Sequence, residues 1–254
     1  MLFDTHAHLD DDRFDEDRRQ IIEQCKAEGV ELILNAASNL ETSLSSIALS
    51  KEYDFIYASV GVHPHDAKSM DNKTTEILSD LAANTKVKAI GEIGLDYHYD
   101  FSPREVQKQR FMEQIDLAKQ LKLPIIVHDR ESHGDIMDIF NKMNVSGMGG
   151  VLHSFSGSVE MARECLKLGF YLSVSGPLTF KNNVKTVEVV REIPLDMLLI
   201  ETDSPYLTPA PYRGQRNYPG HVRYVAEKIA EIKGLTFDEV ARTTLENGKK
   251  LFNI

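Results

Sequence analysis

Short apolar runs alternate with longer segments of mixed polarity along most of the chain. The short runs are rich in β-branched and aromatic residues, as is typical of strands, and the longer segments repeat apolar residues at helical spacing. Eight strands are predicted, over residues 2–7, 30–37, 55–62, 87–94, 123–128, 149–155, 170–176 and 197–204. Helices are predicted between and after them, for example over residues 15–29, 102–122, 158–169, 221–234 and 237–252.

This alternation favours an α/β fold of the (β/α)8 TIM-like barrel type, because eight strand–helix units in about 250 residues is the count of such a barrel. A doubly wound open sheet is the competing fold. It more often has fewer strands and a glycine-rich phosphate loop after the first strand, whereas here that strand is followed by the sequence HAHLD. We find no linker or low-complexity segment, and therefore predict one domain over residues 1–254.

Composition and charge narrow the class of protein. No apolar run approaches the roughly 20 residues that span a bilayer, and the start of the chain does not resemble a secretory signal. The two cysteines, Cys25 and Cys165, have no CxxC partner, so we expect a reduced cytoplasmic protein without membrane contact. The net charge of −10 argues against broad binding along a nucleic-acid backbone. It leaves open a nuclease that holds a few nucleotides through metal ions.

Side chains that can bind metals follow many of the predicted strands. In a barrel these positions meet at the carboxyl end, where the functional residues of the fold lie. At the first strand, residues i and i+2 share a face, so Asp4, His6 and His8 point the same way; an edge strand with solvated histidines is the alternative. The strand-end residues are His6 and His8, His63 and His65, Glu92, His128 with Asp129 and Arg130, His153, and Glu201 with Asp203.

These residues form a set of ligands without cysteine. Imidazole and carboxylate ligands suit Zn²⁺, Mn²⁺, Fe²⁺, Ni²⁺ or Mg²⁺, and more than four of them suggest two divalent metal ions close together. Two metals need a bridging ligand. Glu92 is the natural candidate, because a carboxylate can offer one oxygen to each metal and an imidazole cannot.

The chain resembles the TatD family of metal-dependent deoxyribonucleases, within the amidohydrolase superfamily, over nearly its whole length. GEIGLDYH, IETDSPYLTP and the RGxxN loop, in this order and spacing, are the more specific of the matching motifs. The matching segments are DTHAHLD (4–10), GVHPHD (61–66), GEIGLDYHYD (91–100), PREVQKQRF (103–111), PIIVHDRE (124–131), LHSFSGS (152–158), IETDSPYLTP (200–209) and YRGQRNYPG (212–220).

The resemblance implies a TIM-like barrel with a two-metal site and exonuclease-type hydrolysis of DNA phosphodiester bonds. It places four ligands around one metal, and Glu92 with two histidines around the other. The first set is His6, His8, Glu92 and Asp203, and the second is Glu92, His128 and His153. Single-stranded DNA, shortened from its 3′ end, is the expected substrate. One departure lies in the C-terminal loop, which commonly reads RGxxNEP in the family, because Tyr218 replaces the glutamate here.

We assign roles to the remaining candidates as hypotheses. Asp203 is the best general base, since a carboxylate beside a metal can accept the proton of water. Arg130 is expected to stabilise negative charge on the phosphate, and an ion pair with Glu131 is the alternative. Asp4 either orients a ligating imidazole or caps the strand end. The catalytic residues are therefore Asp203, Glu92 and Arg130, and the substrate-binding residues are His63, His65, Arg130, Arg213 and Asn217.

Two other functions remain open at this point. A metallohydrolase of the same superfamily that acts on a small ester, amide or phosphoester is slightly favoured by the acidic composition. A non-catalytic binding platform is the second, and the intact set of ligands argues against it. A barrel buries its own sheet edges, so we expect a monomer without an obligate protein partner.

Overall fold

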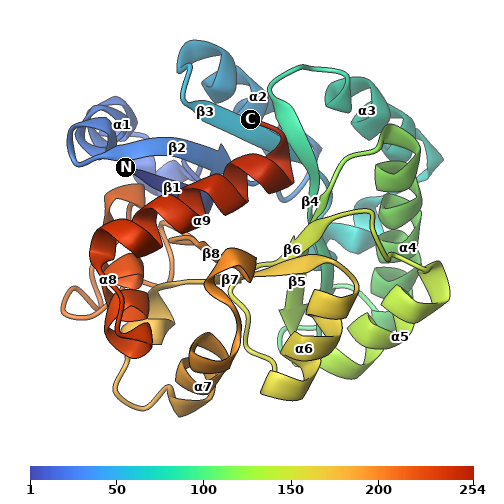
Figure 1. The fold of residues 1–254 in the computed structure, drawn as a ribbon. Coiled ribbons are helices and arrows are strands. Elements are labelled where there is room, and N and C mark those ends of the chain that lie inside the picture. The colour runs from blue at the N-terminus through green and yellow to red at the C-terminus, as the bar shows by residue number, and fades with distance from the viewer.

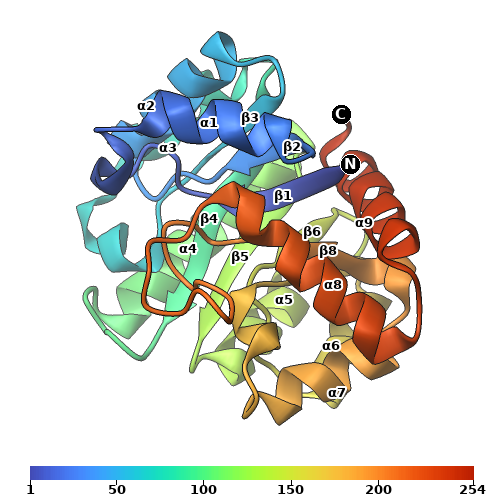
Figure 2. The same ribbon diagram turned by 90° about the vertical axis from the view of Figure 1, so that its left-hand side faces the viewer.

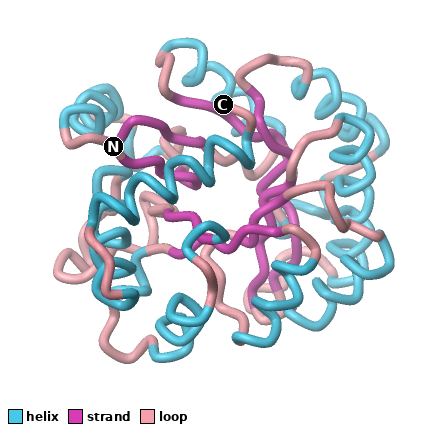
Figure 3. Tube along the Cα trace, viewed as in Figure 1, coloured by secondary structure: helices cyan, strands magenta, loops and turns pink.

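Eight parallel strands form a ring in chain order, β1 to β8 (Figures 1 and 3). The computed structural model describes residues 1–254, except for the side chain of residue 72. Ala7 and Ser204 form a parallel bridge that joins β1 to the end of β8, so the predicted TIM-like barrel is confirmed. The strands are β1 Leu2–Ala7, β2 Val30–Asn35, β3 Ile56–Val60, β4 Val87–Asp96, β5 Ile125–Arg130, β6 Gly150–Leu152, β7 Phe170–Val174 and β8 Leu198–Ile200.

Helices connect the strands and surround the barrel. The α-helices are α1 Arg18–Ala27, α2 Leu40–Glu52, α3 Asn72–Ala82, α4 Arg104–Leu121, α5 His133–Met143, α6 Val159–Lys167, α7 Val184–Glu192, α8 Val222–Lys233 and α9 Phe237–Phe252. Short 3-10 helices lie at Asp12–Phe14, Pro64–Ser69, Gly176–Thr179, Leu195–Met197 and Pro219–His221. Among the described residues, no helix is both long enough and apolar enough to cross a membrane.

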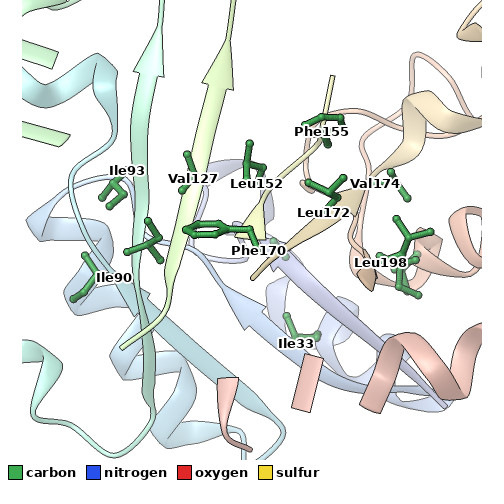
Figure 4. Close-up of a cluster of buried hydrophobic side chains, with 14 of the residues drawn as sticks. Ile33, Ile90, Ile93, Val127, Leu152, Phe155, Phe170, Leu172, Val174 and Leu198 are labelled. Carbon is green, nitrogen blue, oxygen red and sulfur yellow. The ribbon is translucent and has the colours of Figure 1, made fainter. Parts of the chain in front are cut away.

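Alternate residues of each strand enter two different hydrophobic clusters. Ile125 and Val127 of β5 belong to the larger cluster, part of which Figure 4 shows and which also contains residues of the surrounding helices, whereas Ile126 between them belongs to the smaller one. Because successive side chains of a strand point to opposite faces, the smaller cluster fills the inside of the ring. Its members are Phe3, Leu32, Leu34, Ala36, Ala89, Ile126, Val151, Tyr171, Leu199, Leu245 and Phe252.

Helix α9 closes the amino end of the barrel. Its residues Leu245 and Phe252 are part of the inner cluster, and the ring of Phe252 lies 5.9 Å from that of Phe3. Figure 2 shows α9 at one end of the barrel and the long loop between β8 and α8 at the other. The carboxyl ends of the strands are therefore left for the loops that carry the polar side chains.

Some strands end at other residues than the sequence predicts. β4 and β5 run two residues further, because their pairing continues as far as Asp96 and Arg130. β6 and β8 are shorter than predicted. Ser154 and Asp203, just beyond them, have positive φ angles of 41° and 55°, so the chain turns out of the sheet at these positions.

Gly94 allows β4 and β5 to approach closely beside the polar residues. Its φ is +145°, and a Cβ atom placed on it would lie 2.0 Å from the carbonyl oxygen of His128. Only glycine fits this position without moving β5, because the obstacle is backbone.

We predict that Gly94→Ala lowers the free energy of unfolding by about 3 kcal/mol, since it adds both a clash and a strained backbone conformation. Urea denaturation followed by circular dichroism measures the change. Gly134→Ala is the control, because a Cβ atom there meets nothing within 4 Å and alanine favours the helix by about 0.5–1 kcal/mol. Equal stability of the two variants would contradict the prediction.

Candidate metal centre

Glu92 lies at the centre of a group of imidazoles at the carboxyl end of the barrel. Strand β4 carries it, and its side chain is almost fully buried. Its Oε2 atom lies 3.2 Å from Nε2 of His6 and 3.7 Å from Nε2 of His8. Its Oε1 atom lies 2.7 Å from Nδ1 of His128 and 2.8 Å from Nε2 of His153. Each carboxylate oxygen therefore faces its own set of histidines, and His63 also lies near Oε1.

His6, His8 and Asp203 form the first group of donor atoms that could hold a cation. Oδ1 of Asp203 lies 3.7 Å from Nε2 of His6 and 3.4 Å from Nε2 of His8. Nδ1 of His8 lies 2.9 Å from the carbonyl oxygen of Ala36, to which it donates. That hydrogen bond leaves the lone pair on Nε2, on the side of the carboxylates, as a metal ligand requires.

Two further groups of donor atoms lie beside the first, and one of them shares His6 with it. One combines His63, Glu92 and His128, and the other combines His6, His153 and Glu201. The sequence predicts His63 as a substrate contact, whereas the structure places it among the donor atoms, with Nε2 3.5 Å from Oε1 of Glu92. Nδ1 of His63 accepts a hydrogen bond from the amide of His65, so Nε2 carries the proton of the neutral ring. His63 is therefore oriented to donate toward the carboxylate.

Asp96 is a residue of the site that the sequence reasoning missed. It is buried, and its Oδ2 atom lies 3.0 Å from Nε2 of His65 and 3.1 Å from Nε2 of His128. It thereby fixes the orientation of His128, whose other nitrogen faces Glu92. The sequence contains a pattern that predicts this position, because Asp96 follows Glu92 by an even number of residues on the same strand and so shares its face.

Glu201 was noted at the end of a strand but given no role. It is buried, it accepts a hydrogen bond of 2.6 Å from the amide of Ser154, and its Oε1 atom lies 3.4 Å from Nδ1 of His153. These contacts position the loop that carries His153.

The site attracts positive charge. Burial alone would raise the pKa of Glu92, but His153, His63 and His6 around it lower that pKa well below its ordinary value. Burial opposes a charge on His8, yet the carboxylates of Asp203 and Glu92 raise its pKa to about 9. His63 is the exception, because burial lowers its pKa to about 4. A divalent cation would supply the positive charge that protons on the imidazoles otherwise provide.

The donor atoms fit a metal centre by their chemistry as well. Imidazole nitrogens and carboxylate oxygens converge on both sides of one carboxylate, and the His8 and His128 rings are each held through their second nitrogen, as metal-binding histidines are. All six predicted ligands, namely His6, His8, Glu92, His128, His153 and Asp203, lie in this one cluster.

The predicted substrate residues lie in different surroundings. His65 contacts Asp96, and Arg130 is exposed at the end of β5, with its guanidinium 5.1 Å from the centre of the Tyr99 ring. Arg213 is exposed and lies over the ring of Phe180. Asn217, in contrast, is fully buried. Its amide donates to the carbonyl oxygens of Thr202 and Tyr206, and its oxygen accepts from the amide of Tyr218, so its visible role is to hold the loop.

The structure also shows the roles of Asp4 and Tyr218, which the sequence left open. The carboxylate of Asp4 accepts hydrogen bonds of 2.8 and 2.5 Å from the amide and hydroxyl of Thr202, so it ties β1 to the segment after β8 and contacts no imidazole. Tyr218, which replaces the usual glutamate, donates to the carboxylate of Glu28 on the segment after α1. Arg216 pairs with Asp17 beside it. The loop is therefore fixed to α1 without the glutamate.

A barrel with a buried histidine and carboxylate centre defines a class of metal-dependent hydrolases, and the comparisons with known proteins agree. The family model described as TatD related DNase matches residues 3–253. A relative from Bacillus subtilis (strain 168), named an uncharacterized metal-dependent hydrolase, YabD, is 52% identical over the full length of both chains. A Shigella flexneri relative, named a 3′-5′ ssDNA/RNA exonuclease, TatD, is 34% identical and covers 100% of this chain and 99% of its own.

A solved structure supports the same conclusion. The TatD homologue YJJV from Escherichia coli superposes with a TM-score of 0.94 and 32% identity, over 100% of this chain and 98% of its own. This chain belongs to the TatD family and is a metal-dependent hydrolase, as the sequence predicts.

We predict that Asp96→Asn weakens the binding of Zn²⁺ about 10- to 100-fold, because loss of an outer hydrogen-bond partner frees the ligating imidazole. Competition with a chromophoric chelator measures the affinity. Asp66→Asn, on the 3-10 helix beside His65 and without contact to an imidazole of the cluster, is the control. Unchanged affinity of Asp96→Asn would show that Asp96 does not orient His128.

Proposed function

We propose that this protein is a metal-dependent exonuclease that hydrolyses phosphodiester bonds of single-stranded DNA from the 3′ end. The observation that carries the proposal is the placement of Glu92, whose two oxygens face two different sets of histidines. A carboxylate in that position can bridge two divalent metal ions, and two-metal sites serve in-line displacement at phosphorus. The name of the 34% identical Shigella relative, an exonuclease on single-stranded DNA and RNA, supports the substrate.

In the proposed centre, His6, His8, Glu92 and Asp203 would hold one metal, and Glu92, His128 and His153 would hold the other. Bound divalent ions would activate water at neutral pH and polarise the phosphate. Zn²⁺, Mg²⁺, Mn²⁺, Ni²⁺ and Fe²⁺ are all compatible with these nitrogen and oxygen donors.

Asp203 is the proposed general base. Burial would raise its pKa, but His8, His6 and His153 lower it below the ordinary value, so the carboxylate is ionised at neutral pH and able to accept a proton. Its side chain keeps some exposure, at 14%, which leaves it within reach of water. Arg130 is exposed next to the site. We assign it the role of stabilising the negative charge that develops on the phosphate.

A small-molecule hydrolase is the second candidate, and the net charge of −10 favours it. Such an enzyme would hydrolyse small esters or phosphoesters and leave oligonucleotides intact. A time course on a denaturing gel distinguishes the two. A single-stranded oligonucleotide labelled at its 5′ end is mixed with the protein and Mg²⁺ or Mn²⁺, beside a control with chelator.

Stepwise loss of single nucleotides, abolished by the chelator and in Glu92→Ala, is the expected result. Glu92→Ala should also retain fewer metal ions per chain by elemental analysis, since the proposed bridge is removed. Intact DNA beside a metal-loaded protein would refute the nuclease proposal and direct attention to small esters.

For Asp203→Asn we expect kcat to fall about 10²- to 10⁴-fold, the usual contribution of a general base. The amide oxygen of asparagine can still bind a cation, so the metal content should stay close to that of the wild type. Single-turnover cleavage and elemental analysis of the same sample measure the two quantities. If turnover persists with metal bound, Asp203 is not the base.

A further inference from the structure

Three large aromatic side chains are exposed among the described residues, and all three contact a histidine in or next to the metal centre. Among the described residues, Tyr99, Phe101 and Tyr206 are the aromatic members of the exposed large apolar side chains, at 48%, 56% and 48% exposure. Tyr99 and Phe101 lie in the loop after β4, and Tyr206 follows β8. In a ring of eight strands in chain order, β4 and β8 lie opposite each other, so the aromatic residues flank the centre from two sides.

Tyr99 and Phe101 are stacked against each other and against the site. Their ring centroids are 5.3 Å apart with 29° between the planes. Both rings meet His65 edge to face, at 5.3 and 4.8 Å. His65 in turn lies 4.3 Å from the ring of His63 and 3.0 Å from the carboxylate of Asp96. We call Tyr99 and Phe101 the aromatic platform, and it is continuous with the metal centre.

Two cations border the aromatic platform. The guanidinium of Arg130 lies 5.1 Å from the centre of the Tyr99 ring, and Nζ of Lys68 donates to the carbonyl oxygen of Phe101 at 3.0 Å. Both side chains are exposed. In the part of the chain that the structure describes, no carboxylate lies within 4.0 Å of either cation. Their charges are therefore available to an anion.

The side at Tyr206 is different. The guanidinium over its ring belongs to Arg13, at 4.1 Å, and Arg13 is held by both carboxylate oxygens of Asp11. The hydroxyl of Tyr206 also donates to Asp11. Here the cation is neutralised by the protein itself, so this side offers less to a phosphate than the aromatic platform does.

We propose that the aromatic platform stacks an unpaired nucleobase of the substrate strand, while Arg130 and Lys68 hold the phosphates on either side of that nucleotide. The inference rests on the proposed function and adds a specific site to it. Exposed aromatic faces bind bases of any sequence, and adjacent cations bind the backbone. At the aromatic platform the two lie together. A base must be unpaired to stack there, so the site selects single strands over blunt duplex ends.

The absence of tryptophan from the chain allows a direct binding test. Tyr99→Trp keeps an aromatic face at the platform and creates a single tryptophan, whose emission is quenched when a base stacks on it. The probe is single-stranded dT8 in the presence of chelator and, separately, of Ca²⁺. An oligomer of the same length without bases is the matched ligand. Tyr57→Trp, beside Lys86 at 4.5 Å and on β3 away from the platform, is the control variant.

We expect saturable quenching of Tyr99→Trp by dT8, and neither quenching by the abasic oligomer nor quenching of Tyr57→Trp. Phe101→Trp serves as the second reporter if Tyr99→Trp does not fold. In the native background, Tyr99→Leu and Phe101→Leu should raise KM for single-stranded DNA about 5- to 100-fold, with metal content unchanged.

Two negative outcomes are distinguishable. Stepwise cleavage of DNA without quenching at either reporter, and with unaltered KM in the leucine variants, would overturn the aromatic platform and leave the proposed function intact. A metal-loaded protein that neither cleaves DNA nor binds dT8, measured by anisotropy of a labelled strand, would overturn both.

Discussion

The carboxylate of Glu92 is the group on which the functional end of this molecule depends. A buried carboxylate costs several kcal/mol unless charges or hydrogen bonds compensate for it. Here His6, His8, His128 and His153 surround it, each within 3.7 Å of one of its oxygens. The rings of His8 and His128 are in turn held by acceptors of their own, the carbonyl oxygen of Ala36 and the carboxylate of Asp96. The carboxylate and the imidazoles around it thus compensate for one another's burial.

The barrel brings these residues together through its strand order. β1, β4, β5 and β6 carry or precede the histidines and Glu92, and the segment after β8 returns to β1 with Asp203, whose amide donates to the carbonyl oxygen of His6. Gly94 lets β4 approach β5 at the same level. The close packing of the strands thus sets the distances between the side chains at the carboxyl end. The inner hydrophobic cluster, closed by α9, supports the strands from inside the barrel.

The two sides of the metal centre differ in chemistry. On the side of β4, exposed rings and unpaired cations border the donor atoms, whereas on the side of β8 the arginine is already bound to Asp11. In the proposed nuclease, this asymmetry would give a bound strand a direction, since the exposed rings and the cations of Arg130 and Lys68 lie on the side of β4. These two cations would also give an acidic protein a local place to bind phosphate.

Periodicity and motif alone predicted the barrel and the residues that cluster at its carboxyl end. The alternation of strands and helices predicted the (β/α)8 fold, and the strand-end positions of His6, His8, Glu92, His128, His153 and Asp203 predicted one cluster, because parallel strands of a ring share a carboxyl end. All six side chains meet there. The lengths of β6 and β8 were predicted less well, since where a chain leaves a sheet depends on the contacts of its neighbours.

Only the tertiary structure decided the contacts between loops far apart in the sequence. Asp96 orients His128, Asp4 binds Thr202 and Tyr218 binds Glu28. Asn217, expected at the substrate, is buried with its amide engaged. No local pattern encodes such pairings, because a hydrogen bond between residues distant in sequence depends on how strands and loops come to lie side by side. The sequence determined which residues gather at one end of the barrel. The folded arrangement decided which of their side chains face one another, because the distances between those side chains depend on how the strands and loops pack.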